Sequence, residues 1–473
     1  MPLKHSQIQK IIMIKKLLFF AIATIFSVHS WGQTLNNEDI KKMSAEFQSN
    51  KDNIALTNAI SSNPIKKLAL NRENIGKVNF FINHKVETKG ISNQKSSGRC
   101  WMYTGLNVLR AKVIEKYKLN SFQFSHNYLF FFDQLEKANL FYNGMIETAF
   151  LPLDDRKVEW LLKHPIGDGG QWTGVVDLIN KYGVVPMEAM PETYQSENTS
   201  MMSRLIRRKM REDGMMLREL GKSRMAKEMV LMRKNEMLAE IYQILAYSLG
   251  EPPVEFEWQF EDKDKMVSPI RKFTPKEFYK EVLNVDLNNY VMIMDNPTLE
   301  YGKLYEIEYD RHTQEGGNWK YINIKASEIK KFAVKSIKAN EGMYFSCDVG
   351  KQLESAKGFL DINTYDYSSL LGVDFGMDKK TRIQTYESGS THGMALMGVN
   401  VLDDNSTDKW LLENSWGAKK GHNGYLIMTD EWFDEYMFRL VLDKRFLDEA
   451  SLKILEQKPI MLPPWDPMFS LDQ

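Results

Sequence analysis

The chain has 473 residues, of which 43% are hydrophobic and 12% aromatic, so it can bury a large core and does not read as a disordered protein. Its 62 Lys and Arg residues balance 62 Asp and Glu residues, which gives zero net charge with His neutral and no chain-wide electrostatic attraction to nucleic acid. The two cysteines, Cys100 and Cys347, are too few for a disulfide-stapled scaffold or a Cys₄ zinc site.

The N-terminus has the pattern of a secretory signal. Lysines precede an apolar run of 12 residues (17–28), which is shorter than the about 20 residues that a membrane-spanning helix needs. Small residues follow up to Gly32, so residues 1–32 are predicted to be a signal peptide, with Met13 as the natural start. The mature protein is then expected to be periplasmic or secreted and to lack a stable membrane span. A core helix and an uncleaved anchor are the alternatives.

The next segments are polar and then helical. Residues 33–87 are predicted to form a polar arm rich in Asn and Lys. The stretch 102–117, directly after Cys100, is compatible with a helix. Residues 201–236 hold 11 Lys or Arg, five Asp or Glu and eight Met, and we expect helices here that are broken at Gly214 and Gly221.

Strand-like runs appear only later in the chain. They alternate or concentrate apolar and β-branched residues over short stretches, as strands do. The predicted strands are 290–294, 303–309, 394–401, 410–413 and 425–428. Helices early and strands late predict an α+β protein with a helical insertion in the middle.

The first segment that could carry chemistry ends at Cys100. A cysteine at the start of a helix feels the positive end of the helix dipole, which favours the thiolate. Gln94, six residues earlier, could turn its amide toward an oxyanion, with the Cys100 backbone N–H as a second donor. Taken alone, a buried and inert cysteine at a helix start is the plainer interpretation.

Two later segments supply a histidine and an asparagine. His392 begins an apolar strand-like run, where an imidazole could reach a thiol across a cleft. Asn414 follows another such run and precedes Trp416, so its amide could orient an imidazole and be shielded from water. Taken alone, a hydrogen-bonding histidine and a turn-forming Asn-Ser-Trp-Gly are the plainer interpretations.

In combination these residues form the set required for thiol-based acyl transfer. The sequence Gly98-Arg99-Cys100-Trp101 stands where the papain signature has Gly-Ser/Ala-Cys-Trp/Tyr. His392 lies 292 residues after Cys100, compared with about 130–150 in simple papain-like enzymes. A large helical insertion would account for much of the difference.

At this point the chain resembles a known family, the bleomycin hydrolase/aminopeptidase C branch of papain-like cysteine peptidases. The matching motifs run in family order through nearly all of the chain after the signal. They are NQKSSGRCW (93–101), NYLFFFDQ (127–134), GDGGQW (167–172), DKDK (262–265), SCDVGK (346–351), THGMALMGV (391–399), ENSWG (413–417), GHNGYLIMTDEWFDEYM (421–437) and LPPWDPM (462–468).

The resemblance implies a fold and an order of regions. The fold is a papain-like two-lobed α+β peptidase, with the cysteine in a helical lobe and the histidine and asparagine in a β-barrel-like lobe. After the signal and the arm, the expected regions are the helical lobe (88–200), a helical insertion used in oligomerisation (201–290), the β lobe (291–458) and a C-terminal arm in the active-site cleft (459–473).

The resemblance also implies roles for individual residues. Cys100 would be the nucleophile, His392 the general base and then acid, and Asn414 the residue that orients the imidazole. Gln94 would complete the oxyanion hole, and Trp416 would cover the bond between the asparagine and the histidine. Gly169 and Gly170 match the glycine pair that lets a substrate backbone lie close.

The C-terminus carries a further implication of the family. There the terminal carboxylate lies in the cleft and meets the free amine of the substrate, which favours removal of N-terminal residues. Gln473 would hold this carboxylate. The ending Phe469-Ser-Leu-Asp-Gln departs from the small residues of better-known members, since Phe469 is bulky and Asp472 adds a charge.

The sequence therefore predicts a cysteine aminopeptidase that acts on peptides with a free N-terminus and assembles as a homohexamer. We expect no cofactor and no metal, only a reduced Cys100 thiol, and no nucleic-acid partner. The alternatives are a catalytically weak or inactive oligomer that binds nucleic acid or other partners, and an acyltransferase with the same dyad. The excess of positive charge over 201–236 is the observation that supports the alternative of nucleic-acid binding.

Overall fold

The computed structural model describes residues 34–86, 88–223 and 226–469. The predicted signal peptide (1–32) and Gln473 lie outside these residues. The chain divides into two compact units, residues 1–68 and 69–473, and the division falls within the stretch predicted to be an arm. Among the residues just given, no helix is long and apolar enough to cross a membrane.

The first unit consists of short, solvated helices. They are α2 (Asn37–Ser49), α3 (Asp52–Ser62) and α4 (Ile65–Leu68), and none of them buries a residue. The side chain of Asn36 accepts hydrogen bonds from the backbone N–H groups of Glu38 and Asp39, and the Asp39 carboxylate accepts one from the Asn36 backbone N–H, so the two residues form a capping box.

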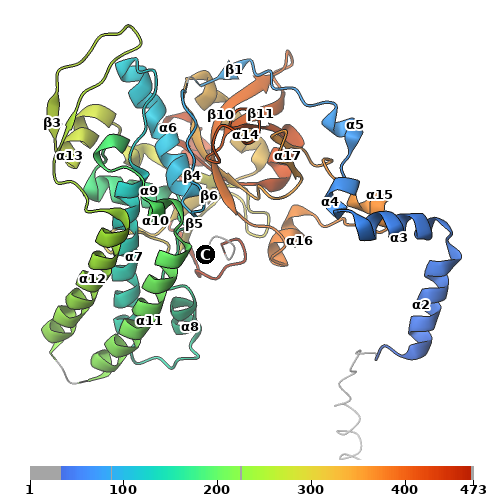
Figure 1. Cartoon of the computed structure of the whole chain (residues 1–473), viewed down its shortest axis with the longest axis horizontal. Coiled ribbons are helices and arrows are strands. Elements are labelled where there is room, and N and C mark those ends of the chain that lie inside the picture. Colours follow the sequence, from blue (N-terminus) through green and yellow to red (C-terminus); the bar gives the residue numbers. More distant parts are fainter. Residues whose placement is uncertain (1–33, 87, 224–225, 470–473) are drawn as a thin grey trace, which may run out of the picture. The chain divides into compact units, whose positions relative to one another are not determined.

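The second unit has a helical half built around two long buried helices. Helix α6 (Cys100–Tyr117) is buried on nearly all sides, so it runs through the interior and not along the surface. Helix α7 (His126–Glu147) contacts α6, α9 (Trp172–Tyr182), α11 (Ser200–Lys222) and α12 (Lys227–Leu249), and the last two run beside it in Figure 1. One apolar core joins these helices.

The Met-rich stretch differs from the prediction at one of its glycines. Helix α11 continues through Gly214, so the break expected there is wrong, and it ends at Lys222, one residue after the break expected at Gly221. A Cβ at Gly214 would lie 2.9 Å from Phe141 Cε1 of α7, and one at Gly221 would lie 3.0 Å from Ala149 Cβ. These glycines therefore permit close packing of α11 against α7, which offsets their low helix propensity.

The other half of the second unit is a mixed sheet that supplies the strands predicted late in the chain. Strand order is β14-β5-β6-β4-β13-β7-β10-β11-β12-β9-β8, and β1 also pairs with β10. The strands are β14 (Ile460–Leu462), β5 (Lys303–Ile307), β6 (Lys320–Asn323), β4 (Tyr290–Met294), β13 (Met437–Asp443), β7 (Met343–Cys347), β10 (His392–Val401), β11 (Thr407–Glu413), β12 (Tyr425–Thr429), β9 (Phe359–Leu360), β8 (Leu353–Glu354) and β1 (His84–Lys85).

Smaller elements complete this unit. A second core lies between the sheet and α14 (Ala326–Lys338), and α6 contacts β10 and β7 from the helical half. The remaining elements are α5 (Arg72–Ile75), α8 (Arg156–Lys163), α10 (Tyr194–Glu197), α13 (Pro275–Phe278), α15 (Tyr367–Leu371), α16 (Lys379–Gln384), α17 (Asp430–Tyr436), α18 (Glu449–Ile454) and the ribbon β2 (Phe256–Trp258) with β3 (Arg271–Phe273). The α+β prediction is confirmed.

Candidate active site

A cleft of about 590 Å³ opens where the helical half meets the sheet. Its helical side includes Cys100 and Trp101 of α6, and its sheet side includes His392 and Gly393 of β10. Five of the residues predicted from the sequence line this one cleft: Gln94, Cys100, Gly169, Gly170 and His392. Residues nearly 300 positions apart in the chain thus share one surface.

Cys100 is the first residue of α6 and follows Arg99 at the N-cap. The N–H groups of a helix's first turn have no acceptor within the helix, so this is the positive end of a long, buried helix. Cys100 is half-buried, whereas Cys347 is fully buried in β7. Burial raises the pKa of the Cys347 thiol well above its usual value, which makes it a structural thiol.

The His392 imidazole is held by Asn414. Nε2 of His392 lies 2.8 Å from Asn414 Oδ1, and that oxygen also accepts a hydrogen bond of 2.8 Å from the Ser415 backbone N–H. Because Oδ1 can only accept, Nε2 carries the hydrogen and Nδ1 of the neutral ring is the basic nitrogen. Burial lowers the pKa of His392 to about 4, although the bond to Asn414 acts in the opposite direction.

Trp416 covers this pair. Its ring stacks on the His392 ring with 4.9 Å between centroids and 29° between planes. His392 is 6% exposed and Asn414 is 2% exposed, so their hydrogen bond lies in a site from which water is largely excluded. A hydrogen bond in such a low-dielectric place is stronger than the same bond in water.

Gln94 is fixed from two directions. Its backbone N–H donates to the Ser415 carbonyl at 2.8 Å, and its Oε1 accepts from Ser415 Oγ at 2.6 Å. Its Nε2 donates to the Ser97 carbonyl at 2.7 Å. Since an amide nitrogen carries two hydrogens, the second one is available to an oxyanion in the cleft.

Gly169 and Gly170 lie on a loop whose backbone carbonyls are held by hydrogen bonds from Lys137 and Trp101. The Lys137 ammonium donates to the carbonyls of Gly167 at 3.0 Å and Gly169 at 2.5 Å, and the Trp101 indole donates to the Asp168 carbonyl at 2.7 Å. A Cβ at Gly170 would lie 2.6 Å from Trp101 Cε2, so a side chain there has no room.

Several residues that support this arrangement were missed by the sequence analysis. The Asp168 carboxylate accepts a hydrogen bond from the Gly98 backbone N–H at 3.1 Å. It also accepts hydrogen bonds from the hydroxyls of Thr199, which directly precedes α11, and of Ser203 within α11. Arg99 is fully buried and forms an ion pair with Glu192, whose side chain is 18% exposed. The partners in these contacts are 31 to 93 residues apart, so spacing gave no signal. The one available sign was the charged residue Arg99 directly before Cys100.

The described C-terminal residues also reach the cleft. Pro464 and Phe469 are among its lining residues, and the Phe469 ring packs edge-on against Trp319 with 4.9 Å between centroids. Phe469 is 3% exposed. The bulky residue that departs from the expected small ending is thus an apolar anchor, and Gln473 lies outside the described residues.

The helix-and-sheet architecture, with a cysteine at the start of the central helix and a His–Asn pair on the sheet, is that of a papain-like cysteine peptidase. Residues 34–469 match the Peptidase C1-like family, and the chain belongs to this family.

Curated relatives and a solved structure agree with this assignment. The chain is 38% identical to aminopeptidase C of Listeria monocytogenes over 439 residues, which cover 92% of this chain and 99% of that protein. It is 38% identical to human bleomycin hydrolase over 448 residues, which cover 92% and 98%. The crystal structure of PepW from Lactobacillus rhamnosis superposes with a TM-score of 0.89 at 37% identity, and covers 92% of this chain and 98% of that one.

Proposed function

We propose that this cysteine aminopeptidase releases N-terminal residues from peptides through a thioester with Cys100. Cys100 Sγ attacks the carbonyl carbon of the N-terminal residue, and the proton of the thiol passes to His392 Nδ1. The C–N bond then breaks as His392 returns this proton to the leaving amine. Water next attacks the thioester, His392 accepts a proton from the water, and the thiol is regenerated.

The observation that carries this proposal is the His392–Asn414 hydrogen bond in the same cleft as Cys100. It fixes the tautomer in which Nδ1 is basic, and Trp416 excludes water from the bond. Gln94 supplies a donor for the negative charge that develops on the carbonyl oxygen. Removing one such donor typically costs about 10²–10³ in kcat.

We assign the selectivity for a free N-terminus to the C-terminal arm. This assignment is supported by Pro464 and Phe469, which bring the C-terminal segment to the cleft, where a terminal carboxylate would meet a substrate ammonium. A carboxylate there attracts the charged amine and occupies the space that an internal peptide would need.

We further propose that the active form is a homohexamer and that it is exported. Self-association is supported by large apolar side chains that are exposed in the single chain, among them Phe150 at 80% and Tyr247 at 82%. Export is supported by the apolar run 17–28 behind its lysines. An oxidising compartment would require Cys100 to be kept reduced for activity.

Covalent labelling tests the assignment of the nucleophile, because the chain has only two cysteines. A haloacetamide should alkylate Cys100 and leave the buried Cys347 unmodified, and activity should fall in proportion to the label. Cys100→Ala should fold normally and lose turnover by several orders of magnitude. Activity retained at full labelling of Cys100 would refute the mechanism, and a folded, reduced wild type without peptidase activity would favour the interaction-only alternative.

A further inference from the structure

The residue directly before Cys100 is a fully buried arginine. The Arg99 side chain is 0% exposed and forms a two-point ion pair with Glu192, at 2.9 Å from Nη2 to Oε2 and 3.3 Å from Nη1 to Oε1. The guanidinium also packs over the rings of Tyr103 and Phe130, at 5.3 and 5.1 Å from their centroids. Removing a guanidinium from water is costly, and an ion pair formed in this way often adds little to the stability of the fold. Stability alone therefore does not explain why this ion pair lies beside the nucleophile.

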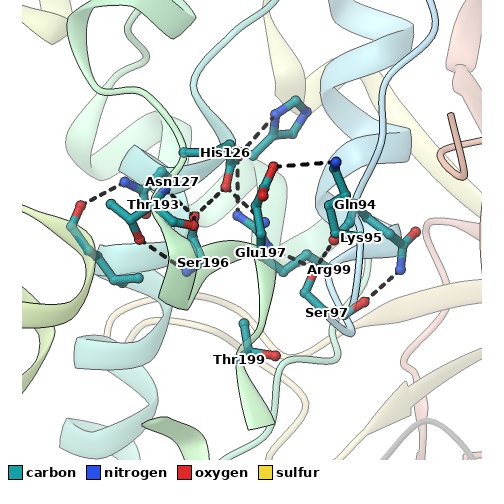
Figure 2. A network of polar contacts seen from close by, with 12 residues as sticks. Gln94, Lys95, Ser97, Arg99, His126, Asn127, Thr193, Ser196, Glu197 and Thr199 are labelled. Atoms are coloured by element: carbon teal, nitrogen blue, oxygen red, sulfur yellow. Dashed lines mark hydrogen bonds and ion pairs between the residues drawn. The ribbon is translucent and has the colours of Figure 1, made fainter. Parts of the chain in front are cut away.

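A chain of hydrogen bonds leads from this ion pair to Gln94. Arg99 Nε donates to Ser97 Oγ at 3.1 Å, and Ser97 Oγ donates to the Gln94 carbonyl at 2.6 Å. The Ser97 carbonyl in turn accepts from the Gln94 carboxamide at 2.7 Å. Ser97 and Gln94 are thus hydrogen-bonded to each other twice across the loop 94–97, and Arg99 holds Ser97. Figure 2 shows Gln94, Ser97 and Arg99 together.

Glu192 is itself held by several donors. Ser196 Oγ donates to Oε2 at 2.6 Å, the Tyr103 hydroxyl donates to Oε1 at 3.2 Å, and His126 Nδ1 lies 3.8 Å from Oε1. Burial would raise the pKa of Glu192, but Arg99 and the surrounding donors bring it below its usual value, so the carboxylate stays charged. Burial also lowers the pKa of His126 to about 3, which leaves that imidazole neutral and Arg99 as the cation that Glu192 faces.

The network is anchored in the helical insertion. Thr193 Oγ1 donates to the Ser248 carbonyl at 2.9 Å, and the Asn127 amide donates to the Leu249 carbonyl at 2.7 Å and to Pro191 at 2.9 Å. Ser248 and Leu249 are the last residues of α12. The Glu192 segment therefore connects the end of α12 with the residue that precedes Cys100. Figure 2 shows Thr193, Ser196 and Arg99 within one network of polar contacts.

We propose that Arg99 and Glu192 are positioning residues that hold the Gln94 carboxamide in the orientation needed to bind the oxyanion. The inference rests on the proposed function and deepens it. The ion pair acts through Ser97 and Gln94, so it stabilises the transition state and contributes little to the binding of the substrate. A two-point Arg–carboxylate contact fixes direction as well as distance, which a neutral pair would do less well.

The test compares two reactions of the same thiol in Glu192→Gln. With a peptide aldehyde, Cys100 Sγ adds to the carbonyl carbon and the thiol proton goes to the oxygen, which occupies the oxyanion position. With iodoacetamide, Sγ displaces iodide and no oxyanion forms. We expect Glu192→Gln to lower kcat by about 10–100-fold at nearly constant KM, to weaken aldehyde affinity by the same factor, and to leave the alkylation rate of Cys100 unchanged.

Glu136→Gln is the matched control, because Glu136 is a buried glutamate that also forms an ion pair, with Lys181 at 2.5 Å, and it lies outside the cleft. It should change neither kcat nor aldehyde affinity. Gln94→Ala combined with Glu192→Gln should cost little more than Gln94→Ala alone, since both act on one donor. Ser97→Ala, a smaller change than the loss of a buried charge, should reproduce the pattern if Glu192→Gln fails to fold.

Three results would overturn the inference in an enzyme whose wild type is active. They are a loss of kcat with unchanged aldehyde affinity, an alkylation rate that falls in parallel with kcat, and additive effects of Gln94→Ala and Glu192→Gln. Absence of peptidase activity in the wild type would instead overturn the proposed function, so the two failures are distinguishable.

Discussion

His392 is a buried imidazole that is hydrogen-bonded to the neutral amide of Asn414, and its burial sets its proton affinity. Burial disfavours the charged ring and lowers its pKa to about 4. A general base has to be unprotonated, so His392 stays competent down to a lower pH than a solvated histidine, whose pKa is about 6.5. The hydrogen bond to Asn414 raises the pKa, because it favours the imidazolium.

The acid limb of kcat/KM should therefore lie near pH 4 for an aminoacyl amide substrate that does not titrate in this range. Asn414→Ala should move the limb to lower pH, because it removes the contact that favours the charged ring, and should also lower kcat. The measurement is a pH profile of both proteins between pH 3 and 8. An acid limb near pH 6.5 would show that the imidazole is not buried in the working enzyme.

Sequence predicted the chemistry-bearing residues better than the residues that hold them. Cys100, His392, Asn414 and Gln94 are recognisable because their chemical types and chain order are those of thiol acyl transfer. Glu192 carries no such sign, since its ion pair with Arg99 depends on tertiary contact between residues 93 positions apart.

At the scale of elements, α6 and β11 are joined by a second buried ion pair. Arg110 of α6 lies 2.5 Å from Glu413 of β11, and the two side chains are 1% and 0% exposed. Arg110 also donates to the Gly90 carbonyl on the segment that leads to Gln94. The contact thus links the helix that begins at Cys100 with the strand that ends beside Asn414.

Arg110→Met should destabilise the protein by about 3–5 kcal/mol, because it leaves the Glu413 carboxyl buried without its cation. Arg110→Met combined with Glu413→Leu should recover most of this loss, since an apolar pair has no charge to desolvate. Urea unfolding of the two variants measures the difference. A double variant as unstable as the single one would contradict this account of the pair.

The elements were largely predictable and their exact limits were not. The strands 290–294 and 425–428 agree with β4 and β12 to within a residue, because a short continuous apolar run reflects burial directly. The expected break at Gly214 was wrong, because a glycine that admits Phe141 of a neighbouring helix looks the same in sequence as one that ends a helix. Tertiary packing decided between the two.

At the scale of the molecule, one cleft receives side chains from the helices, the sheet and the C-terminal segment. The long insertion that separates Cys100 from His392 in sequence forms α11 and α12 against α7, and does not displace the cleft. The order of motifs along the chain predicted this fold, which the crystal structure of PepW shares at 37% identity over 92% of the chain.

The central claim is that the cleft hydrolyses peptides from a free N-terminus, and one comparison tests it most directly. A fluorogenic peptide with a free amine and its acetylated counterpart are assayed under reducing conditions with the wild type, Cys100→Ala and a chain that ends at Phe469. The wild type should cleave only the free-amine substrate, Cys100→Ala should cleave neither, and the shortened chain should cleave both. Cleavage by Cys100→Ala would contradict the mechanism, and an unchanged preference in the shortened chain would contradict the role of the C-terminal arm.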